Sequence, residues 1–393
     1  MKTTTKRWLG QMVAALTICL GTSLSVSGMA EAVTVTTEVE GSLEGAAAGA
    51  YEGPADEDVT VDGAVIRVAG DGHVSSWLYG GCATSRQGAA EASGCSAVVE
   101  TGGEVSSSVY GGRAMGRQSA EASGNEVKVD GLVQGMVNGG YAAAWAEAAP
   151  AAADGNRVTL RENGDSGSIT GGSADGYGSG SASKNTVTIL GQVRGDVTGG
   201  AEGEHGSGTE VAGNVVNLLK GSIEGNVYGG RSNLGTAVQN KVNFYGGSVG
   251  GTIYAGAIGD GGALSPAAAE NENQLNIYGQ ELAAGNILGM GSLNFYLPND
   301  AAAGTVLLRL TAAEDVDLSG VSIGADLDNG AGAGLSAGDT IALLVANGRI
   351  LADGDIANAA ETLHPIARSH GLRLSVSPDG HTLLATVTEA VEP

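Results

Sequence analysis

The chain has few of the residues that several protein classes need. Only 7 of its 393 residues are proline, and glycine does not recur at every third position, so a collagen triple helix is excluded. Basic residues are also scarce, since 19 Lys and Arg stand against 43 Asp and Glu and give a net charge of −24. Such a surface repels the phosphates of nucleic acid, so we expect no nucleic-acid partner.

Glycine, by contrast, is abundant. The 68 glycines far exceed ordinary usage, and helix interiors tolerate glycine poorly, which excludes a helical protein. Hydrophobic residues make up 42% of the chain and charged residues 16%, so there is enough apolar surface to bury and disorder is disfavoured. The apolar residues occur in short alternating runs, which are typical of β-strands.

The N-terminal segment has the features of a signal peptide. Three basic residues within the first seven precede a mostly apolar stretch, and Ala30-Glu31-Ala32 matches the small-x-small pattern of signal-peptidase cleavage. We therefore predict that residues 1–32 are removed between Ala32 and Val33 and that the protein is exported. No later run reaches about 18 apolar residues, so we expect no membrane-spanning segment in the mature chain.

The rest of the chain is repetitive. A short strand-like motif ending in Gly-Gly recurs about every 30 residues. Its copies are Trp77-Leu78-Tyr79-Gly80-Gly81, Ser108-Val109-Tyr110-Gly111-Gly112, Met136-Val137-Asn138-Gly139-Gly140, Ser168-Ile169-Thr170-Gly171-Gly172, Asp196-Val197-Thr198-Gly199-Gly200 and Asn226-Val227-Tyr228-Gly229-Gly230, followed by the degenerate Thr252-Ile253-Tyr254-Ala255-Gly256.

A second motif, Asn-x-apolar-x-apolar, lies upstream of each Gly-Gly. Its copies begin at Asn125, Asn156, Asn185, Asn214, Asn240 and Asn273. In a strand this spacing places the Asn and both apolar side chains on one face, so the Asn points inward if the apolar pair is buried. Amides stacked on successive coils can hydrogen-bond to one another, so we predict a buried Asn ladder.

The two halves of the repeat differ in length variation. From Asn to the next Gly-Gly the spacing is nearly constant, whereas the Gly-, Ala- and Ser-rich segment that follows varies. We interpret the constant half as stacked strands and the variable half as surface loop. One unit has too few strands and no hairpin signal for a propeller blade, so the predicted fold is all-β, a right-handed parallel β-solenoid.

Composition also predicts the domain boundaries. Residues 58–297 carry 50 glycines in 240, and we assign them to the solenoid. Residues 298–393 carry 11 in 96 and have longer apolar runs, so we assign them to a C-terminal β cap that covers the open end. Residues 33–57, acidic and alanine-rich, are expected to form a looser N-terminal cap or linker.

The motif Asn-x-Val-x-φ followed by Gly-x-Val-Tyr-Gly-Gly, behind a signal peptide, resembles the passenger domains of Gram-negative autotransporters. The segment from Leu293 to Leu344 resembles the pertactin-type cap of that family. The resemblance implies an adhesin-like protein at the cell surface, associated with the outer membrane, or secreted. It also implies a translocator barrel after the cap, and the chain reaches Pro393 without one, so anchoring is not implied.

One tripeptide suggests receptor binding. Arg194-Gly195-Asp196 is an integrin-type motif, and its Gly195 fills a slot that other repeats also fill with glycine. The side chains of Arg194 and Asp196 should point outward on a strand face. The alternative to a receptor site is a solvated ion pair on the sheet.

Two cysteines remain after processing. Cys82 and Cys95 open and close one variable segment, and the export route is oxidising, so we predict a disulfide between them. The alternative is a pair of unpaired buried thiols.

Tyr79, Tyr110, Tyr228 and Tyr254 occupy equivalent slots, with Asn138, Thr170 and Thr198 between them. This column suggests either a platform for stacking sugars or a ladder that stabilises neighbouring strands, and the interruptions favour the ladder.

Sequence signatures of catalytic and metal-binding sites are weak. Gly164-Asp165-Ser166-Gly167-Ser168 spells a serine-protease signature, but it fills an ordinary repeat slot and lacks a credible histidine base. Asp326-x-Asp328-Asn329-Gly330 imitates a calcium loop but has Ala337 where Glu is needed. The five histidines have no metal-binding spacing, so we expect neither metal nor cofactor.

We therefore predict a non-catalytic display scaffold that binds a host-cell or extracellular-matrix receptor, or a glycan. The alternative is a β-helix carbohydrate-active enzyme of the lyase or hydrolase type. Such an enzyme needs carboxylates and an Arg or Lys that converge on one sheet face across adjacent coils.

Overall fold

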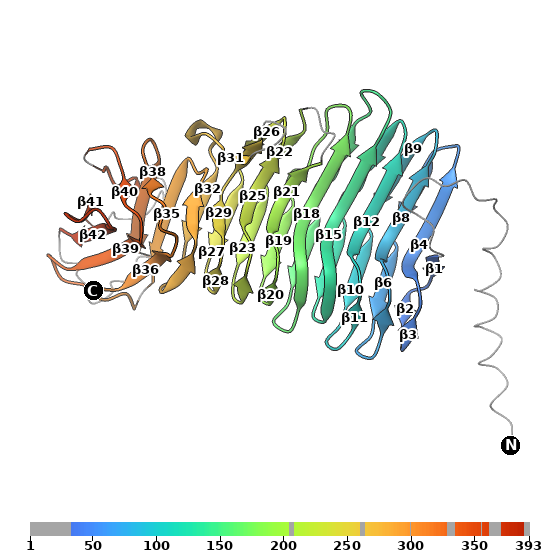
Figure 1. Ribbon diagram of the computed structural model, residues 1–393, viewed down its shortest axis with the longest axis horizontal. Helices are drawn as coiled ribbons and strands as arrows, with labels where there is room; N and C mark the ends of the chain where they lie inside the picture. The colour runs from blue at the N-terminus through green and yellow to red at the C-terminus, as the bar shows by residue number, and fades with distance from the viewer. Residues whose placement is uncertain are drawn as a thin grey trace, which may run out of the picture.

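The computed structural model describes residues 33–203, 208–259, 264–298, 300–327, 335–354, 356–360 and 371–388. These residues form a β-solenoid, in which each coil of chain stacks its strands in parallel on those of the coil before. Figure 1 shows the strands side by side along the longest axis, in chain order from β1 at one end to β42 at the other. Apart from the one short 3-10 helix Ala269–Asn271, every regular element in these ranges is a strand, which confirms the all-β prediction.

One sheet of 11 strands takes a strand from each coil. Its strands are β2 (Glu38–Val39), β6 (Val65–Val68), β10 (Ser96–Val99), β14 (Glu126–Val129), β17 (Arg157–Leu160), β19 (Thr186–Ile189), β23 (Val215–Leu218), β27 (Lys241–Phe244), β32 (Gln274–Ile277), β35 (Ser292–Leu297) and β38 (Ser322–Leu327). In β14 the alternation that was predicted from sequence is observed, because Val127 and Val129 are wholly buried while Glu126 and Lys128 are partly exposed.

A larger sheet of 23 strands forms the other main face. Its long strands are β4 (Ala46–Ala55), β8 (Leu78–Ser85), β12 (Val109–Gly116), β15 (Leu132–Ala144), β18 (Asp165–Gly176), β21 (Val197–Glu202) and β25 (Val227–Ser232). Its shorter strands include β1 (Val33–Val35), β3 (Ser42–Leu43), β7 (His73–Val74), β11 (Glu104–Val105), β20 (Gln192–Val193), β24 (Ser222–Ile223), β28 (Ser248–Val249), β29 (Thr252–Tyr254), β30 (Ala257–Gly259), β31 (Leu264–Pro266), β33 (Leu282–Ala284) and β34 (Asn286–Leu288). The remaining four strands of this sheet lie toward the C-terminal end and are described below. Apolar side chains from both sheets meet in one continuous core.

The variable half of the repeat is more regular than expected. We predicted surface loops there, but β5 (Val59–Asp62), β9 (Ala89–Ser93), β13 (Ser119–Glu121) and β16 (Ala151–Ala152) form a third parallel sheet, and β22 (Glu210–Ala212) pairs with β26 (Thr236–Val238). The reason is packing, because alternate alanines such as Ala90 and Ala120 point inward and build a second buried cluster. Alanine is small enough to let the sheets approach closely there.

The predicted Asn ladder is present. We use the name inner Asn ladder for Asn125, Asn156, Asn185, Asn214, Asn240 and Asn273, whose side chains are at most 1% exposed. At each link Nδ2 of one Asn donates to Oδ1 on the next coil at 2.9–3.1 Å. The same oxygen accepts the backbone N–H of the first Asn at 2.9–3.0 Å. Every buried amide of the ladder is thus partnered.

The Gly-Gly pairs leave room for this ladder. A Cβ on Gly112 would collide with the amide of Asn125, and a Cβ on Gly111 would collide with the carbonyl oxygen of Gly139 on the next coil. Glycine is therefore required at these two positions of β12 for close approach. Left-handed backbone angles occur at turns, both just before the Asn, as at Gly124 with φ of 66°, and elsewhere, as at Gly102 with φ of 87°.

The ends of the solenoid extend beyond the expected boundaries. The segment 33–57, expected to be a loose cap or linker, belongs to the first coil, because β2 pairs with β6 and β4 pairs with β8. Parallel stacking continues past residue 298, where β36 (Val306–Leu310) joins β33 and β39 (Thr340–Ala346). The far end is closed by antiparallel strands β41 (Leu372–Val376) and β42 (Thr382–Val387). Residues 1–32, with the predicted cleavage residue Ala32, lie outside the described residues, and Val33 begins β1.

Candidate functional site

The integrin-type tripeptide lies on the larger sheet, between β20 and β21. The Arg194 Nε donates to Asp165 Oδ1 at 3.0 Å on the preceding coil, and its Nη2 donates to the carbonyl oxygen of Val133 at 3.1 Å. The Asp196 Oδ1 accepts the backbone N–H of Asn226 at 2.8 Å on the following coil. Both side chains point outward as predicted. Each is bound to a neighbouring coil, so the tripeptide is held flat on the sheet.

The two cysteines are free thiols, so the structure lacks the predicted disulfide. The register explains why. Cys95 lies opposite Asn125, in the inward slot of the inner Asn ladder, and its backbone N–H donates to Asn125 Oδ1 at 2.8 Å. Cys82 directly follows the Gly-Gly pair of β8. Its side chain lies on the face of β8 that points away from Cys95, in a separate cluster with Tyr79. Burial raises the pKa of both thiols.

The tyrosine column is a stack of rings. Tyr79 and Tyr110 lie opposite each other on adjacent strands, with ring centroids 5.5 Å apart and planes 21° apart. The guanidinium carbon of Arg113 lies 5.7–5.9 Å from the ring centroids of Tyr79, Tyr110 and Tyr141. Burial raises the pKa of Tyr110, and Arg113 partly opposes this. Because the rings contact one another and a cation, the geometry favours the ladder over a sugar platform.

A charged cleft lies on the outward face of the 11-stranded sheet. It has a volume of about 260 Å³. Its lining residues are Val98, Val99, Glu100, Thr101, Lys128, Asp130 and Arg161. These come from β10, β14 and β17 and the residues just after them, on three adjacent coils. The cleft therefore brings carboxylates, a lysine and an arginine together across coils, as the carbohydrate-active alternative requires.

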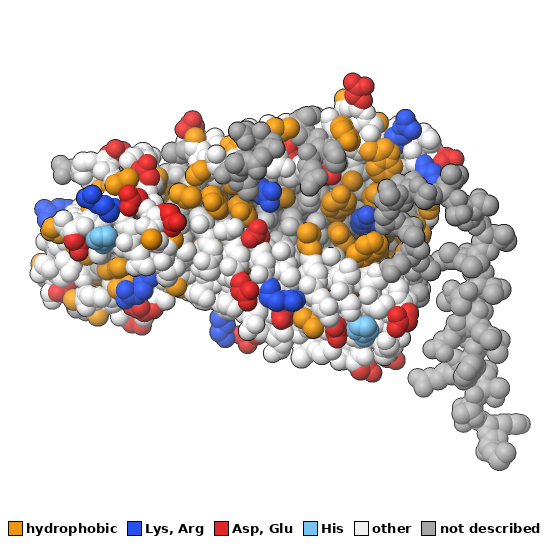
Figure 2. Space-filling view, in the orientation of Figure 1, with side chains coloured by type: hydrophobic (Ala, Val, Ile, Leu, Met, Phe, Trp, Pro, Cys, Tyr) orange, Lys and Arg blue, Asp and Glu red, His pale blue; other side chains and the backbone are white. Residues whose placement is uncertain are grey.

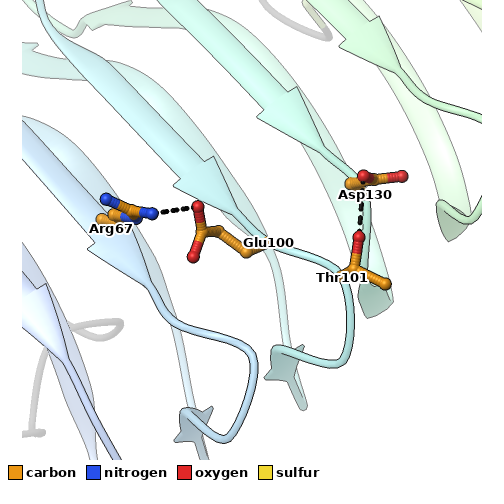
Figure 3. Close-up of polar contacts among 4 residues, drawn as sticks. All are labelled: Arg67, Glu100, Thr101 and Asp130. Carbon is orange, nitrogen blue, oxygen red and sulfur yellow. Dashed lines mark hydrogen bonds and ion pairs between the residues drawn. The ribbon is translucent and has the colours of Figure 1, made fainter.

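The carboxylates of the cleft are held apart. Glu100 is ion-paired with Arg67 of the preceding coil. Asp130 Oδ2 accepts the hydroxyl of Thr101 at 2.8 Å. Figure 3 shows Glu100 turned toward Arg67 and away from Asp130. The two carboxylates thus do not face one point. A pair of carboxylates that shares acid and base roles on one glycosidic bond must do so.

The basic residues of the cleft differ in their partners. Lys128 is ion-paired with Glu126 at 2.6 Å between Nζ and Oε2. Arg161 is exposed, and within the described part of the chain no hydrogen bond or ion pair involves its guanidinium. Arg161 is therefore the side chain of this cleft that is available to an anionic group of a ligand.

One buried carboxylate was not foreseen from sequence. Glu202 at the end of β21 is 4% exposed, and its Oε2 accepts the hydroxyl of Ser232 at 2.5 Å. The same oxygen accepts the backbone N–H groups of Asn233, Leu234 and Gly235 at 2.7–3.1 Å. Burial opposes its ionisation, but these hydrogen bonds prevail and lower the pKa of Glu202. It anchors the turn after β25.

The described residues give no support for a metal site. In the ranges that the structure describes, no three His, Cys, Asp or Glu side chains are grouped to hold a metal ion. Asp326 of the calcium-like sequence lies in β38 and is 2% exposed, while Asp328 falls outside the described residues. No helix among the described residues is long and apolar enough to cross a membrane.

Figure 2 shows one face of the molecule, where charged side chains lie singly or in small groups among uncharged ones. Hydrophobic side chains gather near strands β8 to β15.

No protein-family model, curated protein or solved structure matches the chain.

Proposed function

We propose that the protein is an exported, non-catalytic display scaffold, at the cell surface or secreted, that resembles an adhesin-like autotransporter passenger. Its partner is a host-cell or extracellular-matrix receptor or a glycan. The observation that carries the proposal is a contrast between two faces of each coil. Inward slots repeat the same residues, as in the inner Asn ladder, whereas the outward slot that follows each Asn is exposed or half-buried and holds Glu126, Arg157 and Thr186 on successive coils.

This contrast has a physical reading. A uniform interior makes a rigid support, because each coil contacts only its neighbours and adds similar stability. Outward slots that differ from coil to coil give every position along the axis its own chemistry. Exposed side chains held on a rigid support bind with little loss of conformational entropy.

The test is a binding assay on the full chain, with immobilised matrix proteins, cultured host cells and a glycan array as probes. Binding to at least one of these probes is expected. If the tripeptide takes part, Arg194→Ala weakens binding, while the matched control Lys241→Ala, an outward residue of the other sheet, leaves it unchanged. Absence of binding to all three classes of probe would contradict the proposal.

The charged cleft favours a second candidate, a β-helix carbohydrate-active enzyme. In this alternative Asp130 serves as acid or base, and Arg161 holds an anionic sugar. Incubation with neutral and acidic polysaccharides, followed by assay of reducing ends and unsaturated products, tests it. Activity that is lost in Asp130→Asn but retained in the control Glu162→Gln would replace the display proposal. Absence of turnover on every substrate would eliminate the enzyme.

A further inference from the structure

Three tyrosines stack on the outward face of the 11-stranded sheet. Tyr245 follows β27, Tyr278 follows β32 and Tyr296 lies in β35, at matching positions on three consecutive coils. The ring centroids of Tyr245 and Tyr278 are 4.4 Å apart, and those of Tyr278 and Tyr296 are 4.3 Å apart. The planes of these two pairs differ by 7° and 10°. We call these three residues the Tyr stack.

The Tyr stack is tighter than the other stacked pairs of the described residues. The centroids of Tyr79 and Tyr110 are 5.5 Å apart, and those of Tyr228 and Tyr254 are 5.0 Å apart. Among these stacked pairs, the rings lie closest together and most nearly parallel in the Tyr stack.

A row of outward amides holds the Tyr stack in register. Asn217, Asn243, Asn276 and Asn294, which we call the outer Asn row, lie on successive coils. Their Nδ2 to Oδ1 distances are 2.8–2.9 Å. Three of these Asn lie two positions before a member of the Tyr stack, on the same face of the sheet. Sliding of one coil past the next would break these bonds, so the rings stay aligned.

Access and protonation differ within the Tyr stack. Tyr245 is 42% exposed, whereas Tyr278 is part-buried between its two neighbours. Burial raises the pKa of Tyr278, and the adjacent phenols of Tyr296 and Tyr245 raise the pKa further. Tyr278 is therefore a neutral phenol that lies between two neighbouring rings. Its oxidation to a phenoxyl radical therefore releases one electron and one proton.

We propose that the Tyr stack is a modification site at which adjacent rings become joined as dityrosine. The oxidant is the ferryl haem of a peroxidase acting with hydrogen peroxide, and Tyr245 is the ring it reaches. This inference does not depend on the proposed function.

Formation of dityrosine is a two-electron oxidation of two neighbouring tyrosines. Two neighbouring phenols each lose one electron and one proton and become phenoxyl radicals. The radicals couple through ring carbons beside their oxygens, which forms one C–C bond. The hydrogens on those two carbons then move to the oxygens, which restores both phenols. The two electrons and two protons released reduce one hydrogen peroxide to two waters at the haem.

The cross-link would join the last solenoid coils next to the C-terminal cap, because β35 pairs with β38. It would covalently fasten strands that are otherwise held by hydrogen bonds and packing. A scaffold exposed to peroxide would then gain a staple that needs no cysteine.

The test uses the full folded chain, with peroxidase and limiting hydrogen peroxide. Digestion at glutamate separates the three tyrosines, because Glu270 and Glu272 lie between Tyr245 and Tyr278, and Glu281 lies between Tyr278 and Tyr296. We expect dityrosine fluorescence in the monomeric band, and mass spectrometry should find Tyr278 joined to Tyr245 or to Tyr296. Peptide fragmentation identifies the joined residues.

Tyr278→Phe is the decisive variant, because it keeps a ring in the stack but removes the hydroxyl. It should abolish the cross-link, since the remaining two tyrosines are two coils apart. Tyr177→Phe, which removes an exposed tyrosine elsewhere, should leave the yield unchanged, and circular dichroism checks that both variants fold. The proposal is overturned if Tyr278→Phe keeps the dityrosine yield of the unsubstituted chain in the monomeric band, if dityrosine forms only between chains, or if tyrosine is consumed without dityrosine.

Discussion

Asn185 donates to the same oxygen of Asn214 twice, from its backbone N–H at 2.9 Å and from Nδ2 at 3.0 Å. Its own Oδ1 accepts the equivalent two donors from Asn156 at 2.9 and 3.0 Å. Each amide of the inner Asn ladder is thus fixed by the backbone of a neighbouring coil, so that the ladder and the stacking of strands depend on each other.

Removal of one ladder amide should therefore be costly. Asn185→Ala leaves two donors of Asn156 without an acceptor, and an unsatisfied buried group costs about 1–3 kcal/mol. The matched change Thr186→Ala affects a half-buried outward neighbour and should alter the free energy of unfolding by less than about 0.5 kcal/mol. Urea unfolding measures both. Equal midpoints for the two variants would mean that the ladder contributes no net stability.

The thiols should be unreactive until the chain unfolds. Cys82 and Cys95 are buried, and burial raises the pKa of both, so little reactive thiolate is present at neutral pH. Thiol titration without reductant should find neither residue in the native protein and both in denaturant. Cys82→Ser should lower the denatured count by one. If neither thiol were titrated in denaturant and Cys82→Ser raised the count by one, this would point to a disulfide and to a different register for β8.

Glu202 should make the fold sensitive to acid. Its pKa is lowered in the folded state, because hydrogen bonds to the carboxylate outweigh the opposing effect of burial. Stability from this group is therefore present above the unfolded pKa and is lost as pH falls through the lower folded pKa. Glu202→Gln should cost about 1–3 kcal/mol at neutral pH. Urea midpoints measured against pH should show the difference between the two proteins shrinking in acid. A constant difference would contradict this account.

The ion pair of the tripeptide should contribute little to stability. The side chains of Arg194 and Asp165 are 44% and 39% exposed, and exposed pairs give about 0.2–1 kcal/mol. A double-mutant cycle with Arg194→Ala and Asp165→Ala should give a coupling in this range that falls as salt is added. A coupling that persists in high salt would contradict this account of an exposed, screened ion pair.

The periodicity of the sequence predicted the interior more fully than the surface. The inward position of Asn185 followed from its parity with Val187 and Ile189, because a buried apolar pair fixes the face of a strand. The same rule places Asn243 and Tyr245 together on the outward face, but parity alone does not say that rings on successive coils will stack. Only the register of β27, β32 and β35 shows this.

The surroundings of the two cysteines and of Glu202 are set by how the coils stack. The register that places Cys95 opposite Asn125 separates it from Cys82, although the two are close in sequence. Glu202 finds its partners one coil later, around Ser232, in a segment whose length varies between repeats. No periodic signal marks that contact, so the burial of Glu202 could not be predicted from sequence.

The inner Asn ladder also has a direction. All five of its Nδ2 to Oδ1 bonds point from the earlier coil to the later one. The side-chain dipoles therefore add head to tail along the axis, with the positive end toward the C-terminal cap, and bonds in such a chain polarise one another. The three bonds of the outer Asn row point the opposite way. Backbone N–H groups lock the orientation of the inner ladder. The two rows of amides therefore carry opposed dipoles of unequal length, with five bonds in the inner ladder and three in the outer row.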